Sequence, residues 1–246
     1  DIPYGKLQLK KTDSVSGAAV SGAKYSVYTD SACTKLAKLV DASQKSGATV
    51  SSAEAKNALV TDTNGSSKAI YLQTGTYYVK ETSSPNGYEL NSTVYTVQIA
   101  GPTTSGAGTT VNTAVVNAQD NPFGYLKLRK TQTGTDNQVA GATYGVYTDA
   151  ACTKLATNLD TGKEVKLVTT KTGWVTAKVR PGTYYVKEIE APANYTLNPS
   201  VQTITVSVYS DDTKNVTSSD FTTAVEVQDE LNTSISLKKK SSTDST

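Results

Sequence analysis

The chain contains two copies of one box, in which a strand-like run ends on a glutamate and is followed by a turn. The copies occupy residues 76–88 (TYYVKETSSPNGY) and 183–195 (TYYVKEIEAPANY). We interpret each box as a β-strand. Side chains alternate between the two faces of a strand, so Glu81 is predicted to share the apolar face of Tyr77 and Val79.

The second box repeats this arrangement. Glu188 shares a predicted face with Tyr184 and Val186. A carboxylate directed into a core is costly unless it is neutral, paired or hydrogen-bonded. Each glutamate should therefore have buried partners elsewhere in the chain.

The rest of the chain shows the same duplication. Residues 28–37 and 147–156 are nearly identical, and a lysine lies 22 positions before the cysteine of each segment. Each copy also closes on a Gln-Asp pair. Residues 1–3 match the boundary that precedes the second copy, and residues 234–239 resemble a further opening strand. We therefore expect domains at 1–121 and 122–231, and a tail at 232–246 that begins another repeat, in a piece of a longer array.

Composition narrows the function classes. The formal charge is +2, and no Lys/Arg cluster is interleaved with aromatics, so nucleic acid is not an expected partner. No apolar run is long enough to span a membrane, and we expect no membrane contact by this piece. The chain has no histidine, and no metal cluster, phosphate loop or catalytic triad is visible. We expect no cofactor, no metal and no enzyme acting on an external substrate.

The pattern predicts an all-β fold made of two tandem Ig-like β-sandwiches. Short strands separated by turn signals recur through both copies, and 15 tyrosines suit half-buried sheet surfaces. An insertion in the first copy spans residues 43–58, and residues 52–59 are predicted to form a short helix there. The single cysteine of each copy is predicted to be a buried thiol that behaves as a small hydrophobe.

Alternation also places other charged residues inside. The predicted inward face of the first strand carries a lysine, and that of the last strand carries an aspartate. Burial favours the neutral forms of all three groups, and a neutral amine is a nucleophile that can form an amide with a carboxyl group. The alternative is a buried salt-bridge triad without a bond. The two sets are Lys11, Glu81 and Asp120, and Lys130, Glu188 and Asp229.

Three motifs together resemble the CnaB-type domains of Gram-positive surface adhesins and pilin shafts. They are Leu-x-Leu-x-Lys, Tyr-x-Val-x-Glu-x-x-x-Pro-x-Gly-Tyr and a closing Val-x-Val-x-Asp, and the resemblance covers both copies. It implies an Ig-like fold of reverse topology in which each domain forms an autocatalytic Lys to Asn/Asp isopeptide bond. By this resemblance Glu81 and Glu188 assist, while Lys11 joins Asp120 and Lys130 joins Asp229.

Several alternatives stay open at this point. Many members of that family close on asparagine, which makes Asn117 and Asn121 alternatives to Asp120, and Lys10 is the register alternative to Lys11. The second box has Ala-Asn where the family pattern prefers x-Gly. A Thr–Gln ester also matches the repeat, but its side chains are predicted to point outward and the chain lacks the expected histidine. Its candidate pairs are Thr12 with Gln119 and Thr131 with Gln228.

The function expected from these features is a structural stalk repeat of an extracellular, cell-wall-attached bacterial adhesin or pilin. Its partners are then neighbouring repeats of the same chain, and its only chemistry is one intramolecular turnover per domain. The competing hypothesis is an adhesive module that binds host extracellular matrix or glycan through its loops. The first-copy insertion and Trp174, which could stack on a sugar or simply pack at a sheet edge, are the candidate surfaces.

Overall fold

The computed structural model describes residues 2–43, 47–105, 108–171, 174–210 and 223–229, without the side chains of 223–226 and 229. Within these residues the regular elements are all β-strands, which confirms the all-β prediction. The chain divides into two compact units, built mainly from residues 2–123 and from residues 124–207 with 223–229.

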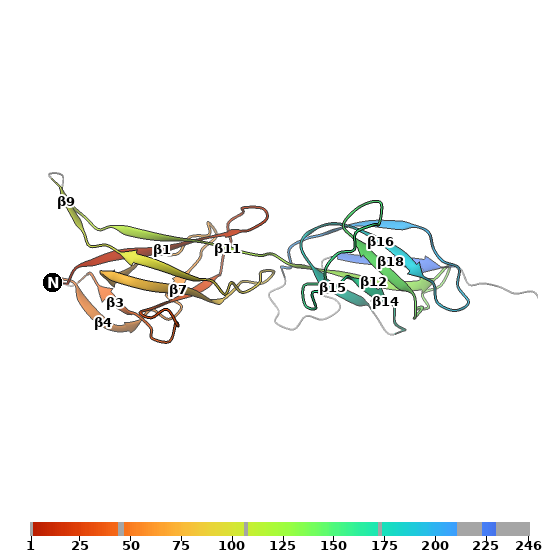
Figure 1. Cartoon of the computed structure of the whole chain (residues 1–246), viewed down its shortest axis with the longest axis horizontal. Helices are drawn as coiled ribbons and strands as arrows, with labels where there is room; N and C mark the ends of the chain where they lie inside the picture. Colours follow the sequence, from red (N-terminus) through yellow and green to blue (C-terminus); the bar gives the residue numbers. More distant parts are fainter. Residues whose placement is uncertain (1, 44–46, 106–107, 172–173, 211–222, 230–246) are drawn as a thin grey trace, which may run out of the picture. The chain divides into compact units, whose positions relative to one another are not determined.

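The first unit contains a three-stranded sheet, a four-stranded sheet and two hairpins (Figure 1). The three-stranded sheet has the order β11-β1-β6, with β1 at Tyr4–Asp13, β6 at Ile70–Gln73 and β11 at Thr113–Asp120. The four-stranded sheet has the order β5-β2-β7-β8, with β2 at Lys24–Tyr28, β5 at Leu59–Val60, β7 at Gly75–Ser83 and β8 at Val94–Ile99. The hairpins pair β3 (Lys38–Asp41) with β4 (Thr49–Glu54), and β9 (Thr103–Ser105) with β10 (Gly108–Thr110).

The second unit has the same two-sheet plan. Its three-stranded sheet has the order β15-β12-β18, with β12 at Gly124–Gln132, β15 at Val175–Val179 and β18 at Thr223–Asp229. Its four-stranded sheet has the order β14-β13-β16-β17, with β13 at Thr143–Tyr147, β14 at Lys166–Val168, β16 at Gly182–Glu190 and β17 at Val201–Val206. Strand for strand, the two units therefore repeat one sandwich topology.

Each unit has its own core, formed by the inward side chains of its two sheets. In the first unit Leu7, Leu9, Tyr25 and Val79 have no exposed surface. In the second unit the buried core residues include Leu126, Leu128, Tyr144 and Val186. Burial alternates along β1 and β7, as it should when one strand face is covered by the opposite sheet.

The first and last strands of each unit are neighbours and run parallel. In the first unit β1 pairs with β11, and Lys11 has Ala118 as its Cα partner. In the second unit β12 pairs with β18, and Lys130 has Val227 as its partner. Parallel strands need a long connection between them, and here the rest of each sandwich supplies it.

The structure corrects two predictions. Residues 49–54 form strand β4 and pair with β3, so the predicted helix over 52–59 is wrong. The cysteines are not buried: both are half-exposed and occupy turns with positive φ, 55° at Cys33 and 53° at Cys152. The tail at 232–246 lies outside the described residues.

The turn of the second box is formed without glycine. Gly87 has a φ of 82° in the first box, and Asn194 has a φ of 71° at the matching place in the second. Asparagine is among the non-glycine residues that adopt this left-handed conformation most readily. The Ala-Asn departure therefore leaves the backbone turn intact.

Candidate functional site

Three charged side chains of the first unit meet in its core. Lys11 projects from β1, Glu81 from β7 and Asp120 from β11, and none is more than 2% exposed. Lys11 Nζ donates to Asp120 Oδ1 and lies 3.4 Å from Glu81 Oε1. The parallel register explains the meeting, because Asp120 follows Ala118, the partner of Lys11, by two residues on the same strand face.

Burial raises the pKa of both carboxyl groups. The pKa of Glu81 rises to about 7 because burial penalises its charged form, while the hydrogen bond from Asn91 N and the nearby Lys11 act in the opposite direction. Burial also raises the pKa of Asp120, although the hydrogen bond from Lys11 opposes it. Both groups can therefore carry a proton at a pH where exposed carboxyl groups are ionised.

One carboxyl oxygen of Glu81 and one of Asp120 are left without a hydrogen bond in the described part of the core. Among the described residues, Glu81 Oε1 and Asp120 Oδ2 are buried and accept no hydrogen bond. Buried polar atoms without a partner are costly. A proton held between the two carboxyl groups would satisfy both oxygens and would stand next to the amine.

A tyrosine completes this cluster, and the strand pattern of the sequence did not predict it. Tyr25 lies on β2, opposite Glu81 in the register with β7, and it is fully buried. Its hydroxyl accepts a hydrogen bond from Lys11 Nζ. Burial, and after it the charge of Glu81, raises the pKa of Tyr25, so the side chain stays a neutral phenol. The available signal was a tyrosine 14 positions after the lysine in both copies.

The second unit repeats the arrangement. Lys130 and Glu188 are each 1% exposed, and Lys130 Nζ lies 3.1 Å from Glu188 Oε1. Lys130 Nζ also donates to the hydroxyl of Tyr144, at 2.9 Å. Asp229 follows Val227, the partner of Lys130, by two residues. The backbone therefore repeats the register of the first unit, whereas the side chain of Asp229 lies outside the described residues.

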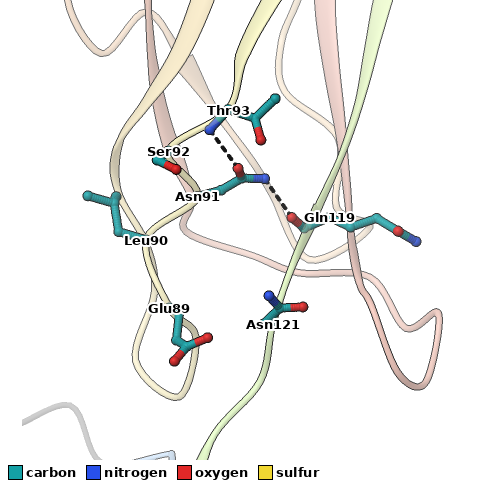
Figure 2. A pocket seen from close by; sticks show the side chains of 7 residues that line it. All are labelled: Glu89, Leu90, Asn91, Ser92, Thr93, Gln119 and Asn121. Atoms are coloured by element: carbon teal, nitrogen blue, oxygen red, sulfur yellow. Dashed lines mark hydrogen bonds between the residues drawn. The ribbon is translucent and has the colours of Figure 1, made fainter. Parts of the chain in front are cut away.

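A loop asparagine holds the glutamate of each unit. The backbone N–H of Asn91 donates to Glu81 Oε2 at 2.6 Å, and that of Asn198 donates to Glu188 Oε2 at 2.7 Å. Figure 2 shows the Asn91 side chain directed from its loop toward Gln119, near the end of β11. Asn91 also lines a hollow of about 340 Å³. The sequence carried a signal for it, a Tyr-x-Leu-Asn run that closes both boxes.

The alternative bond partners lie outside the cluster. Lys10, Asn117 and Asn121 are exposed, and Asn121 Oδ1 accepts a hydrogen bond from Ser14 Oγ. The ester pair is closer together: Gln119 Nε2 donates to Thr12 Oγ1 at 3.5 Å, on the outer side of the sheet. In the second unit Thr131 is 5% exposed and has Gln228 as its Cα partner.

Trp174 is covered by cations. Lys127 Nζ lies 4.6 Å from the centre of its ring, and the guanidinium carbon of Arg129 lies 5.0 Å from it. Both residues belong to β12. This strand pairs with β15, which begins at the residue after Trp174. Cation–π contacts of this kind attach an aromatic ring to a sheet surface. The arrangement favours packing against the sheet over a free stacking platform.

The described part of the chain contains no group of three or more side chains suited to hold a metal ion. No helix with the length and hydropathy of a membrane span occurs among the described residues.

Comparison with known proteins identifies the family of both units. A sequence model of the SpaA domain, described as having a prealbumin-like fold, matches residues 5–114 and 124–222, once in each unit. No curated protein sequence matches the chain.

Several solved structures resemble the chain. The TIE protein of Bacillus anthracis is 22% identical with a TM-score of 0.39, and the alignment covers 93% of this chain but 34% of that protein. A streptococcal ancillary pilin is 21% identical with a TM-score of 0.36 over 94% of this chain and 63% of that one. GBS52, a minor pilin of Streptococcus agalactiae, is 14% identical with a TM-score of 0.37 over 96% of this chain and all of that one. The chain thus spans about a third of the first of these proteins.

Proposed function

The chain belongs to the family of SpaA prealbumin-like fold domains, and on that basis we propose that it is a structural shaft segment of a bacterial surface adhesin or pilin. In this proposal residues 1–121 and 122–231 are CnaB-type domains. Each is stabilised by an isopeptide bond that it forms within itself. Lys11 joins Asp120 and Lys130 joins Asp229, while Glu81 and Glu188 serve as the catalytic acids and bases.

The observation that carries the proposal is the burial of an amine between two carboxyl groups. Lys11 and Asp120 are in contact on adjacent parallel strands, and Glu81 stands beside them with a pKa raised by burial to about 7. A salt bridge needs only one carboxylate for one ammonium. The second carboxyl group, whose pKa burial raises, can supply the acid that amide formation requires.

The reaction balances without any other reagent. The neutral amine of Lys11 attacks Cγ of the Asp120 carboxyl group, while Glu81 donates a proton to the carbonyl oxygen. Glu81 then takes a proton from the nitrogen and returns one to the departing hydroxyl. As water leaves, Glu81 recovers the proton of the remaining hydroxyl, which becomes the amide carbonyl. One C–N bond forms, one C–O bond breaks, and one water leaves. The Tyr25 hydroxyl, hydrogen-bonded to Nζ, orients the amine.

The position of the bond suits a load-bearing segment. The chain enters the first unit at the start of β1 and leaves it at the end of β11, and these ends lie at opposite ends of one parallel strand pair. Tension therefore shears the two strands past each other. A covalent bond between Lys11 and Asp120 transmits the load from strand to strand, so that the residues between them bear none. Forced unfolding, which depends on the unfolding rate, is then blocked.

Intact mass tests the proposal. We expect a chain lighter than its sequence by two waters, and tryptic peptides that join Lys11 to Asp120 and Lys130 to Asp229. Replacement of the exposed Lys10 by alanine is the control and should leave both deficits unchanged. Loss of ammonia in place of water would move a bond to Asn117 or Asn121. No deficit at all would refute the covalent function.

This function implies an extracellular, cell-wall-attached protein whose partners are neighbouring repeats of the same chain. It also implies no cofactor and no turnover of an external substrate, because each unit reacts once with itself. The family membership and the repeated sandwich support this assignment.

One surface favours a second function, the binding of host extracellular matrix or glycan. Among the described residues, the β3–β4 hairpin occurs in the first unit only. Beside it lies a hollow of about 540 Å³ lined by Tyr4, Ala42, Ala48 and Pro102, among others. Immobilised collagen and mucin glycans are suitable probes for the whole chain. Retention that is lost when residues 42–48 are replaced by a two-residue Asn-Gly turn would support this second function.

A further inference from the structure

The loop asparagines contact both sides of the reaction centre. The backbone N–H of Asn91 donates to Glu81 Oε2, and its side-chain amide donates at 2.8 Å to the backbone carbonyl of Gln119, the residue before Asp120. One residue is thus bonded to the catalytic acid and to the strand that carries the acyl group. Figure 2 shows the second of these bonds crossing from the loop to the end of β11.

The side chain also fixes its own loop. Asn91 Oδ1 accepts a hydrogen bond from Thr93 N at 2.9 Å, and Nδ2 lies 3.1 Å from the hydroxyl of Tyr95. These bonds hold the backbone N–H in place, so that Oε2 of Glu81 is occupied. The other oxygen of Glu81, Oε1, is then the one presented to Lys11, at 3.4 Å.

The second unit repeats this arrangement in a different loop sequence. Asn198 donates from its backbone to Glu188 Oε2, from its side chain to the Gln228 carbonyl at 2.9 Å, and accepts from Ser200 N at 2.9 Å. The loops read ELNST and TLNPS, so the asparagine and the leucine before it are what they share. The leucines are exposed, 56% at Leu90 and 47% at Leu197, and do not account for the common geometry.

We propose that Asn91 and Asn198 are positioning residues for isopeptide formation, which set the place of the glutamate carboxyl group relative to the aspartate it activates. They do not touch the reacting atoms. Each acts through two bonds, one to the glutamate oxygen that does not react and one to the peptide group that leads into the aspartate. The inference rests on the proposed function.

The test uses the full chain recovered unfolded in guanidinium chloride, before its strands have met, and then diluted into buffer. Bond formation in each unit is followed by proteolysis and mass spectrometry of the joined peptides. For Asn91→Ala we expect the rate in the first unit to fall at least tenfold and the rate in the second unit to stay unchanged. Asn198→Ala should produce the reverse pattern and tests the inference independently if the first variant does not fold.

Asn112→Ala is the matched control. The Asn112 side chain makes the same type of bond, from its amide to the Gly101 carbonyl at 2.6 Å, but before β11 begins and away from the triad. We expect this substitution to leave the rate of bond formation unchanged. Circular dichroism of both substitutions in a Lys11→Ala chain, which cannot link its first unit, checks that the two alter folding equally.

A pH profile separates positioning from a merely structural role. The groups that face Glu81 are Lys11 from β1, Tyr25 from β2, Asp120 from β11 and the N–H of Asn91. Of these groups, Asn91→Ala displaces only the backbone N–H. The hydrogen bond from this N–H favours the charged form of Glu81, so its loss raises the pKa of Glu81 further. The pH at which the first-unit rate falls should therefore move upward, and it should not move in Asn112→Ala.

The outcomes distinguish this inference from the proposed function. If the unsubstituted chain forms no bond on refolding, both fail. If it forms both bonds while Asn91→Ala and Asn198→Ala react as fast as Asn112→Ala, only the positioning role is overturned. A slower reaction with an unmoved pH profile would also overturn it, because loss of folding alone would then explain the rate.

Discussion

The first unit carries the β3–β4 hairpin between β2 and β5, whereas the second unit joins β13 to β14 without a hairpin strand pair. Their turns differ as well, with Gly87 in one and Asn194 in the other. Yet the lysine, the glutamate, the tyrosine and the loop asparagine keep the same contacts in both. The contacts of the buried cluster are therefore the same in both units although the surrounding strands and turns differ.

A second difference lies close to the cluster. Tyr88 donates to Asp13 Oδ2 at 3.0 Å in the first unit, and Tyr195 donates to Gln132 Oε1 at 3.3 Å in the second. Asp13 is the Cα partner of Asp120, and Gln132 is the partner of Asp229. A carboxylate and a neutral amide thus occupy the same place. A charge there is not required for the tyrosine contact, which needs only an acceptor.

The largest difference between the units should be created by removing one lysine. For Lys11→Ala we expect pulling from residue 1 to residue 246 to release the first unit in a full-length step, at about 3.3–3.6 Å for each of the residues freed, while the second unit stays linked. The unsubstituted chain should show no unfolding step for either unit. Single-molecule force spectroscopy measures these steps. Complete unravelling of the unsubstituted chain at modest force would contradict the shaft function even if the bonds are present.

The same substitution removes a restriction on the unfolded chain. A bond that closes a loop of about a hundred residues is worth roughly 4–5 kcal/mol on the chain-entropy model. Thermal unfolding of Lys11→Ala should therefore show one weakened transition beside an unchanged one.

Removal of one glutamate should prevent isopeptide formation in one unit and leave it unchanged in the other. Glu81→Ala deprives the first unit of its acid, for which a rate loss of about 10²- to 10⁴-fold is typical. Peptides joining Lys11 to Asp120 should disappear, whereas those joining Lys130 to Asp229 should persist. Loss of both links would mean that the triads are not confined to their own units.

Removal of the tyrosine hydroxyl should have a smaller effect. Tyr25→Phe keeps the ring in the core but removes the acceptor for Lys11 Nζ. We expect first-unit bond formation on refolding to slow roughly tenfold, equivalent to about 1.4 kcal/mol, which is within the usual range for one hydrogen bond. Tyr144→Phe is the matched variant in the second unit, and equal slowing of the two would show that the phenol has the same role in both.

The smallest expected effect is that of pH on the unsubstituted chain. The pKa of Glu81 is raised in the fold, so its proton is retained up to about pH 7 and lost above it. Between pH 7 and pH 8 the protonated fraction falls about fivefold, and the first-unit rate should fall with it. Before the bond forms, the same shift favours the folded unit below pH 4.5 and is lost as pH rises through about 7. A first-unit rate that rises steadily over this interval would argue against a protonated Glu81.

Alternation along single strands allowed much of the cluster to be predicted. A strand exposes every second side chain to the same face, so the inward positions of Lys11, Glu81 and Asp120 follow from Leu9, Val79 and Ala118 two residues before them. The duplication then repeated each assignment in the second copy. These are local properties, and the sequence carries them without knowledge of the sheet order.

Other features depended on which strands become neighbours. Residues 52–54 are strand because they belong to β4, which pairs with β3 through Thr49, Val50 and Glu54. This pairing outweighs the weak helical pattern that alanine and glutamate give them. The cysteines lie in positive-φ turns, where their exposure is set by the loop and not by their hydrophobicity.

The sequence by itself determined that this protein is a tandem β repeat with one lysine and one glutamate directed into each core, and with Asp120 directed into the first, because two-residue alternation and duplication are properties of the chain itself. The tertiary structure decided what surrounds them. Tyr25 reaches Lys11 only because β2 pairs with β7, and Asn91 reaches Gln119 only because its loop lies across the end of β11. Such contacts join residues far apart in sequence through strand order and loop path, which local patterns do not specify.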